Sequence, residues 1–273
     1  MKTLLLLVLS TILIILTSNV LAVDVAYVLK NAKKPNKDFL QVFDGLELSV
    51  KLIDDSNVKK TNFSQYNILF VDGEMKQLTN SKSIPVGNMP TIVANMFHPT
   101  TWGLTEEVSS IVSNKPLKIH IIGGSIHQAY TSCCKPGGVG LPMYYLNDFN
   151  KAEGFEKVAE TFINEGLTEG VVQYLPKGKK LLNGKTAKGN LCFYGITETD
   201  FWEPISRDLF EDCVRFVDPT TIDCKNDADC EDGDVLTIDE CINPGTKLSF
   251  CEHTKIECND NDDCGDDILG ELF

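Results

Sequence analysis

Short apolar runs, separated by polar turns, follow one another along most of the chain. The runs are rich in Val, Ile, Leu and Phe and are bounded mainly by Gly, Asp, Asn and Pro, which is typical of buried β-strands. Strands are therefore expected at 23–29, 48–53, 67–71, 90–96, 117–122, 142–146, 171–175 and 189–196.

Between these runs lie segments whose apolar residues recur at steps of three and four, a spacing that places them on one face of a helix. The clearest helix begins near Pro204, because proline suits the first turn. Helices are also expected at 37–46 and 104–112, and 155–162 is expected to be a helix or part of one. The apolar face of the last helix is formed by Trp202, Ile205, Leu209, Cys213 and Phe216.

Strands that alternate with helices predict an α/β fold, in which a mostly parallel sheet has helices on both faces. The run 189–196 leads directly into the last helix, as expected where an α/β domain packs its final helix on its sheet. We therefore expect a three-layer sandwich over residues 23–218. The order of the strands does not follow from one sequence.

The first 22 residues have a different pattern from the rest of the chain. Lys2 precedes an apolar run at 3–16, and Val20-Leu21-Ala22 is typical of a cleavage site. The run has 14 residues, whereas a membrane-spanning helix needs about 20. We therefore expect a signal peptide and a mature protein that is secreted or at the cell surface. The alternative is an uncleaved N-terminal anchor. Such an anchor is the only way in which we expect the protein to attach to a membrane.

The charge changes abruptly near Asp218-Pro219. Residues 219–273 contain 16 Asp and Glu against three Lys, a net charge of −13, while the whole chain carries −14. The preceding part is therefore close to neutral, and a change this sharp predicts a domain boundary. So acidic a segment would repel phosphate groups, which argues against nucleic acid as a partner.

Ten cysteines in an exported chain predict disulfide bonds. Two of them, Cys192 and Cys213, fall on a predicted strand and on the apolar face of the last helix. We expect these two to be buried core thiols, because burial makes a thiol a poor nucleophile. The cysteines expected to form disulfides are Cys133, Cys134, Cys224, Cys230, Cys241, Cys251, Cys258 and Cys264.

The order of these elements, the segment Tyr66–Glu74, and the closing strand with its Trp-containing helix resemble the class I glutamine amidotransferase-like superfamily. Within it, the chain is most similar to the trehalose-utilisation (ThuA-like) branch and to domains of exported archaeal proteins. The resemblance covers about 23–217 and implies a flavodoxin-like three-layer sandwich.

The resemblance also implies where a catalytic residue would lie. Catalytic members carry Cys in a G-x-C-x-G turn after a strand, with a downstream His and Glu, because the reaction needs an exposed thiolate beside a base. The matching strand end here is Ala94–Pro99, which contains neither Cys nor Gly. The ThuA-like branch similarly lacks this Cys and often has a His after the strand, as His98 stands here.

His98 has three alternative roles: a metal ligand, a general base, or a histidine that holds a turn. The last is favoured, because zinc sites usually show several clustered ligands. His120 alternates inside an apolar strand and is expected in the core. His127 ends Gly123-Gly124-Ser125-Ile126-His127, which departs from the serine-hydrolase elbow at its last position.

The acidic segment contains an internal repeat. The C-x5-C stretch Cys224–Cys230 recurs as Cys258–Cys264, and both copies contain Asn and Asp. The first copy of the repeat resembles a short cysteine-rich repeat of surface proteins, but Leu236 stands where that family has its middle Cys. The second repeat is incomplete. Four cysteines, Cys224 to Cys251, allow three pairings, and the sequence does not choose among them.

Two surface chemistries remain. Asn62-Phe63-Ser64 is an N-glycosylation triplet in a polar segment. The only cofactor that the acidic residues suggest is Ca²⁺, since carboxylates are its usual ligands. The spacing does not match an EF-hand loop, so a solvated acidic loop held by disulfides is favoured over a calcium site. The calcium candidates are Asp227, Asp229, Asp232 and Asp234.

Two functions are therefore expected as alternatives. The first is an exported or cell-surface protein whose amidotransferase-like domain is non-catalytic and serves in binding, to a protein or glycan at the cell surface, or in an envelope structure. The second is a secreted hydrolase that acts on carbohydrate or amide substrates through His98. A carboxylate such as Glu74 or Glu106 beside His98 in a pocket would favour the enzyme.

Overall fold

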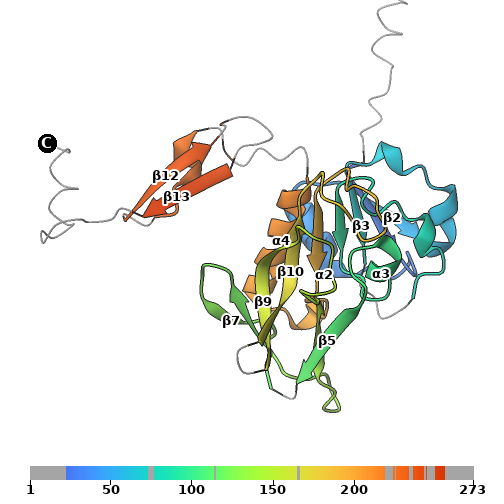
Figure 1. The fold of residues 1–273 in the computed structure, drawn as a ribbon, viewed down its shortest axis with the longest axis horizontal. Coiled ribbons are helices and arrows are strands. Elements are labelled where there is room, and N and C mark those ends of the chain that lie inside the picture. Colours follow the sequence, from blue (N-terminus) through green and yellow to red (C-terminus); the bar gives the residue numbers. More distant parts are fainter. Residues whose placement is uncertain are drawn as a thin grey trace, which may run out of the picture. The chain divides into compact units, whose positions relative to one another are not determined.

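The structure, a computed structural model, describes residues 23–72, 77–113, 115–164, 167–218, 224, 226–233, 236–242, 244 and 250–255. The chain forms two compact units, Met1–Asp218 and Pro219–Phe273 (Figure 1). The division falls where the charge changes. The expected signal peptide, 1–22, lies outside the described residues. None of the helices in the described ranges has the length and apolarity needed to cross a membrane.

The first unit is built on an eleven-stranded mixed sheet. Its parallel part has the strand order β2-β1-β3-β4-β11, which is the flavodoxin-like order. The bounds of these strands are β1 Val25–Leu29, β2 Val50–Asp54, β3 Ile68–Val71, β4 Thr91–Val93 and β11 Leu191–Tyr194.

Beyond β11 the sheet continues with antiparallel strands, in the order β10-β9-β6-β7, and β8 pairs with β10 and with β5. The α/β fold is therefore as expected, but its sheet is mixed. The bounds are β5 Val108–Ser113, β6 Lys118–Ile121, β7 Ile126–Gln128, β8 Leu141–Leu146, β9 Glu156–Asn164 and β10 Leu167–Leu175.

Two predicted helices are strands. The segment 104–112 contains β5, which pairs with β8, and 155–162 lies largely within β9, which pairs with β10. Helical spacing was misleading in both, because these segments are short and partly buried, and pairing with neighbouring strands outweighs their local pattern. In β9 the buried side chains are Ala159 and Thr161, while Phe162 is exposed. Only two residues separate β9 from β10, and the second is Gly166, a signal typical of a hairpin.

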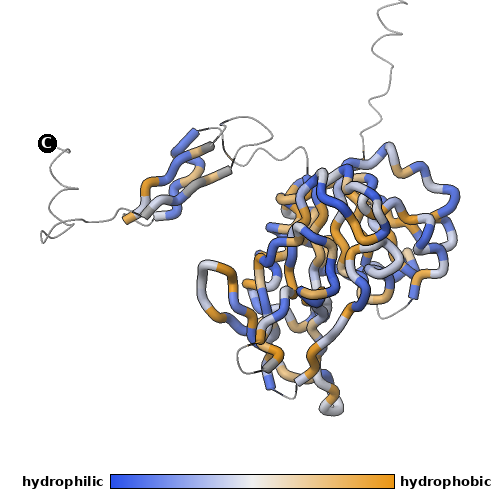
Figure 2. The backbone as a smooth tube through the Cα atoms, viewed as in Figure 1, coloured by the Kyte–Doolittle hydropathy of each residue, from blue (hydrophilic) through white to orange (hydrophobic). Residues whose placement is uncertain are grey.

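Alternate residues of β1 pack into two apolar cores, one on each face of the sheet. Tyr27 joins the core that is covered by α2 (Lys37–Gly45) and α4 (Pro204–Val217), whose apolar faces contribute Phe39 and Phe210. Val28 joins the opposite core, which is covered by α3 (Pro99–Trp102), loops and short 3₁₀ turns. Figure 2 shows hydrophobic positions along the strands of this unit.

Short 3₁₀ turns lie between the strands, and the side chains of Asp54 and Asn62 cap two of them. Asn62, in the glycosylation triplet, is exposed, and its side-chain oxygen accepts hydrogen bonds from the N–H and O–H of Ser64. The turns are η1 Asp55–Lys60, η2 Phe63–Gln65, η3 Ser81–Ser83 and η4 Thr199–Phe201.

The second unit consists of the turn η5 (Asp227–Cys230) and the antiparallel pair β12 (Thr237–Ile242) and β13 (Phe250–Lys255). Two disulfides hold it, Cys224–Cys241 and Cys230–Cys251. Among the described residues, its buried cluster contains cysteines alone. Sulfur therefore takes the place of an apolar core. Cys258 and Cys264 lie outside the described residues.

Candidate functional site

The carboxyl ends of the parallel strands bring polar side chains from distant parts of the sequence to one edge of the sheet. Lys30 follows β1, Asp55 follows β2, and Asn95 and His98 follow β4. Open α/β sheets bind ligands at this edge, so it is the first place to look for chemistry. The question is whether these side chains face a ligand or hold the fold.

Asp55 holds the fold. Its carboxylate accepts hydrogen bonds from the Lys30 ammonium at 2.8 Å and from the backbone N–H groups of Thr79 and Asn80 at 2.7 and 2.9 Å. Burial alone would raise the pKa of Asp55, but these hydrogen bonds and the Lys30 charge lower it overall. A buried carboxylate with this many donors is stabilised in its charged form and ties η1 to the segment before η3.

His98 also holds the fold, through a hydrogen bond to the backbone. Its Nε2 accepts the backbone N–H of Leu78 at 2.9 Å, and its ring lies against Trp102, with 5.7 Å between the ring centroids. The side chain is 5% exposed. Burial lowers the pKa of His98, and the charge of Asp55 offsets this only in part. The ring is therefore neutral at pH 7, with its proton on Nδ1, and serves to hold the chain at Leu78.

The turn after β4 is held by the side-chain amide of Asn95. Asn95 is buried; its Nδ2 donates to the backbone oxygen of Asp72, and its Oδ1 accepts the N–H of Phe97, both at 2.9 Å. Glu106 is exposed, and Glu74 lies outside the described residues. The structure thus brings His98 to Leu78, Trp102 and Asp55, and leaves Glu106 at the surface.

The four cysteines of the first unit form two disulfides, Cys133–Cys134 and Cys192–Cys213. Cys192 and Cys213 are fully buried, but the expectation of free thiols was wrong: they join β11 to α4. Sequence reasoning could have found this bond. Both residues were already placed on surfaces that face each other, the strand and the helix that packs on it.

The remaining histidines of this unit lie on the antiparallel strands β6 and β7. His120 was expected in the core, but it is partly exposed and its Nδ1 lies 3.1 Å from the Glu160 carboxylate; its neighbour Ile119 is the buried residue. The expectation failed because β6 belongs to the antiparallel extension, where alternate residues face solvent. His127 is exposed on β7.

A cavity of about 350 Å³ lies between the η3 loop and the segment after β10. Its walls combine the ammonium groups of Lys82 and Lys185, the Asn183 amide and Trp102. Asn183 Nδ2 donates to the backbone oxygen of Trp102 at 2.8 Å, which ties the segment after β10 to the end of α3. Such a volume suits a small polar ligand. None of these residues was singled out from the sequence, since surface lysines carry no pattern.

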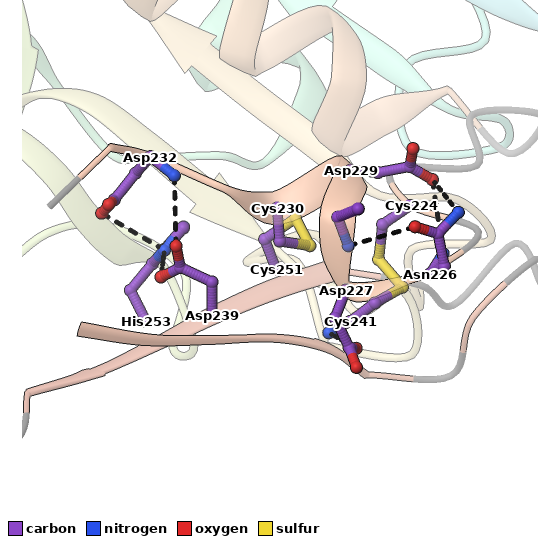
Figure 3. The surroundings of a disulfide bond; sticks show 11 residues. Cys224, Asn226, Asp227, Asp229, Cys230, Asp232, Asp239, Cys241, Cys251 and His253 are labelled. Atoms are coloured by element: carbon purple, nitrogen blue, oxygen red, sulfur yellow. Dashed lines mark hydrogen bonds and ion pairs between the residues drawn. A yellow bond between two sulfur atoms is a disulfide. The ribbon is translucent and has the colours of Figure 1, made fainter. Parts of the chain in front are cut away.

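In the second unit, the expected calcium ligands diverge. Asp227 accepts the N–H of Cys241 at 2.8 Å, and Asp229 accepts the N–H of Asn226, so both serve as backbone acceptors around η5 (Figure 3). Asp232 lies on the other side of the disulfides, and Asp234 lies outside the described residues. The three described candidates therefore do not converge on one point, and the sequence had favoured a solvated acidic loop over a calcium site.

Asp232 instead meets Asp239 and His253 (Figure 3). His253 Nδ1 lies 2.7 Å from Asp239 Oδ1 and 3.4 Å from Asp232 Oδ2. The hydrogen bond with Asp239 is the main cause of the raised pKa of His253, and the charges of both carboxylates add to it. The same hydrogen bond lowers the pKa of Asp239.

No family model matches the chain, and no curated protein matches it. Among solved structures, it is similar to a candidate GMP synthase component from Thermoplasma acidophilum, with a TM-score of 0.39 and 14% identity over 70% of this chain and 92% of that one. This likeness is coarse and concerns the fold alone.

Proposed function

We propose that this chain is an exported or cell-surface protein whose α/β domain is a non-catalytic member of the ThuA-like branch, serving in binding or in an envelope structure. One observation carries the proposal: the lone pair of His98 Nε2 accepts a backbone N–H inside the fold. A histidine used in this way has no free lone pair at Nε2 with which to take a proton from a substrate or to bind a metal.

The neighbouring groups support the same conclusion. A covalent mechanism needs a nucleophile within hydrogen-bond reach of its base, and the turn after β4 offers the Asn95 amide, which already makes two hydrogen bonds. The buried Asp55 faces Lys30 and two backbone N–H groups. No observation at His98 favours the alternative of a secreted hydrolase.

Export is supported by the chemistry of the cysteines. In the described part of the chain every cysteine belongs to a disulfide, and disulfides persist in oxidising compartments. The second unit depends on them for its buried cluster. A protein retained in a reducing compartment would lose that cluster, so the composition of the second unit suits life outside the cell.

The test of the non-catalytic proposal uses the mature chain, 23–273, and the variant His98→Gln, whose side-chain oxygen can still accept the Leu78 N–H. Both are incubated with panels of amide and glycoside substrates. We expect no turnover above a protein-free control from either protein. Turnover by the natural chain that His98→Gln abolishes, with an unchanged melting curve, would overturn the proposal.

Binding is assigned to the cavity between Lys82 and Lys185, because two exposed lysine side chains at one cavity suit an anionic glycan or an acidic peptide segment of a surface protein. An array of neutral and acidic glycans, probed with the mature chain, should show binding to acidic members that is reduced in Lys82→Ala with Lys185→Ala. Lys59→Ala with Lys60→Ala, exposed lysines of η1, is the matched control. Equal binding by all three proteins would contradict this assignment.

A further inference from the structure

We propose that Asp232, Asp239 and His253 form a binding site for a divalent transition-metal ion of the zinc class in the second unit. Each side chain offers one ligand atom, and the three atoms all lie within 4.8 Å of one another. The site shares only Asp232 with the calcium candidates, and it does not depend on the function proposed for the first unit.

The positions of the three ligands are set by the disulfides. Asp239 and His253 are direct cross-strand partners, and so are Cys241 and Cys251, two residues away on each strand. Residues two apart on a strand share a face, so the ligands and the disulfides lie on the same face of this pair of strands. Asp232 is in turn two residues from Cys230, which is bonded to Cys251. All three ligands are therefore anchored through a neighbouring disulfide.

Hydrogen bonds orient the two carboxylates. The backbone N–H of Asp232 donates to Asp239 Oδ2 at 3.2 Å, and the Thr237 hydroxyl donates to Asp232 Oδ1 at 3.3 Å. The other oxygen of each carboxylate, Oδ1 of Asp239 and Oδ2 of Asp232, faces Nδ1 of His253. Outer partners that hold an oxygen of each ligand carboxylate are typical of metal sites.

The donor set selects the class of ion. One imidazole nitrogen with two carboxylate oxygens suits Zn²⁺ and neighbouring transition metals, whereas Ca²⁺ and Mg²⁺ prefer oxygen alone. Ligands about 2.0 Å from a tetrahedral zinc ion are about 3.3 Å apart. The Nδ1–oxygen distances are 2.7 and 3.4 Å, and all three ligand atoms lie within 4.8 Å of one another, so binding needs side-chain adjustment within the existing cluster.

The arrangement also leaves room for a further ligand. The His253 and Asp232 side chains are each 38% exposed, whereas Asp239 is 7% exposed. Three protein ligands with an open side are typical of zinc sites that accept a water molecule or a group from a partner. The exposed side of this site would therefore admit one exogenous ligand.

The experiment is calorimetric titration of the oxidised mature chain, 23–273, with Zn²⁺ and separately with Ca²⁺. We expect Zn²⁺ to bind with one site per chain, more tightly than Ca²⁺. His253→Gln and Asp239→Asn should each weaken Zn²⁺ binding by about 100-fold, and Thr237→Val, which removes an outer partner, by about 10-fold. Co²⁺ provides a second readout, since its visible absorption reports the ligand geometry.

The matched control is His120→Gln, because His120 also meets a carboxylate, that of Glu160 at 3.1 Å, but in the first unit. Zn²⁺ binding should be unchanged in it. Mapping of the disulfides by mass spectrometry shows whether each variant keeps Cys224–Cys241 and Cys230–Cys251. The proposal is overturned by the absence of saturable Zn²⁺ binding, by binding that the His253 and Asp239 variants leave unchanged although their disulfides are intact, or by preference for Ca²⁺.

Discussion

Two disulfides of this protein close loops of the same size in very different surroundings. Cys192–Cys213 and Cys230–Cys251 each join residues 21 positions apart, so each restricts the unfolded chain by a similar amount, worth about 3 kcal/mol. The first lies in an apolar core with Phe210 and Tyr194. The second lies in a cluster made of cysteines. The same covalent bond is therefore an addition to a folded core in one unit and the main source of stability in the other.

The difference follows from composition. Ordering the backbone costs about 1–2 kcal/mol per residue, and burial of apolar side chains must offset this cost. The first unit buries large aromatic and aliphatic side chains on both faces of its sheet. The second unit has few such side chains and many carboxylates, so cross-links lower the entropy of its unfolded chain instead.

The largest effect should come from removing matched disulfides. Cys230→Ser with Cys251→Ser should unfold the second unit, whereas Cys192→Ala with Cys213→Ala should lower the melting temperature of the first unit but leave its transition cooperative. Hydrogen exchange measured by mass spectrometry would follow both units in one experiment. The comparison would fail if residues 237–242 stayed protected from hydrogen exchange after the Cys230 and Cys251 changes. It would also fail if the first unit lost cooperative melting after the Cys192 and Cys213 changes.

The second largest effect should come from shortening a side chain in the core of the first unit. Phe210 is fully buried, and its ring lies 4.5 Å from that of Phe39 and 5.2 Å from that of Tyr194. Phe210→Ala should lower the free energy of unfolding of the first unit by about 3–5 kcal/mol and leave exchange in the second unit unchanged. Phe149→Ala is the control, because Phe149 is 87% exposed and should change stability by less than about 0.5 kcal/mol. Equal losses in the two variants would refute the buried role of Phe210.

A smaller effect is expected from pH. Burial lowers the pKa of His98 below the ordinary 6.5, so the unfolded chain binds a proton more readily than the folded one. The contribution of His98 to stability is therefore complete above about pH 6.5 and decreases as the pH falls from there towards the folded-state pKa. Denaturant unfolding of the chain 23–218 at pH 7 and pH 5 measures this.

The matched variants in that experiment are His98→Gln and His120→Gln. The first removes the titrating group but keeps an acceptor for Leu78, so it should reduce the loss of stability between pH 7 and pH 5. The second changes a partly exposed histidine and should leave the contribution of His98 in place. A pH dependence that His98→Gln does not alter would rule out the assigned role.

The smallest effect should come from removing the second unit. A chain comprising 23–218 should melt cooperatively, at nearly the temperature of the same unit in the mature chain, because its two apolar cores are formed by its own residues. Differential scanning calorimetry of the two chains compares them directly. A non-cooperative melt of the shorter chain would show that the first unit needs the second.

The strands with strong local signals were predictable from the sequence. Val25–Leu29 and Ile68–Val71 are continuous apolar runs bounded by polar residues, and both are buried strands. Pro204 and the apolar face that follows it likewise placed α4. These signals are reliable because a buried strand or an amphipathic helix shows its surroundings in its own residues.

The strands β5 and β9 were not predictable in this way. Their segments are only partly buried, so the spacing of apolar residues is compatible with either a helix or a strand, and pairing with β8 and β10 decides the outcome.

The candidate metal site was hidden for a related reason. The dense run of carboxylates Asp227–Asp234 is visible in the sequence. His253, by contrast, is 14 residues from its partner Asp239 and meets it only through the register of β12 and β13.

The sequence by itself thus determined the α/β class, the change of composition at Asp218 and the absence of Cys and Gly from Ala94–Pro99, because each depends on which residues are present or on short-range periodicity. The tertiary structure alone decided that His98 accepts the N–H of Leu78 and that Asp232 meets Asp239 and His253. These contacts join residues far apart in the chain. Their geometry depends on strand register and packing, which the residue pattern at either end does not encode.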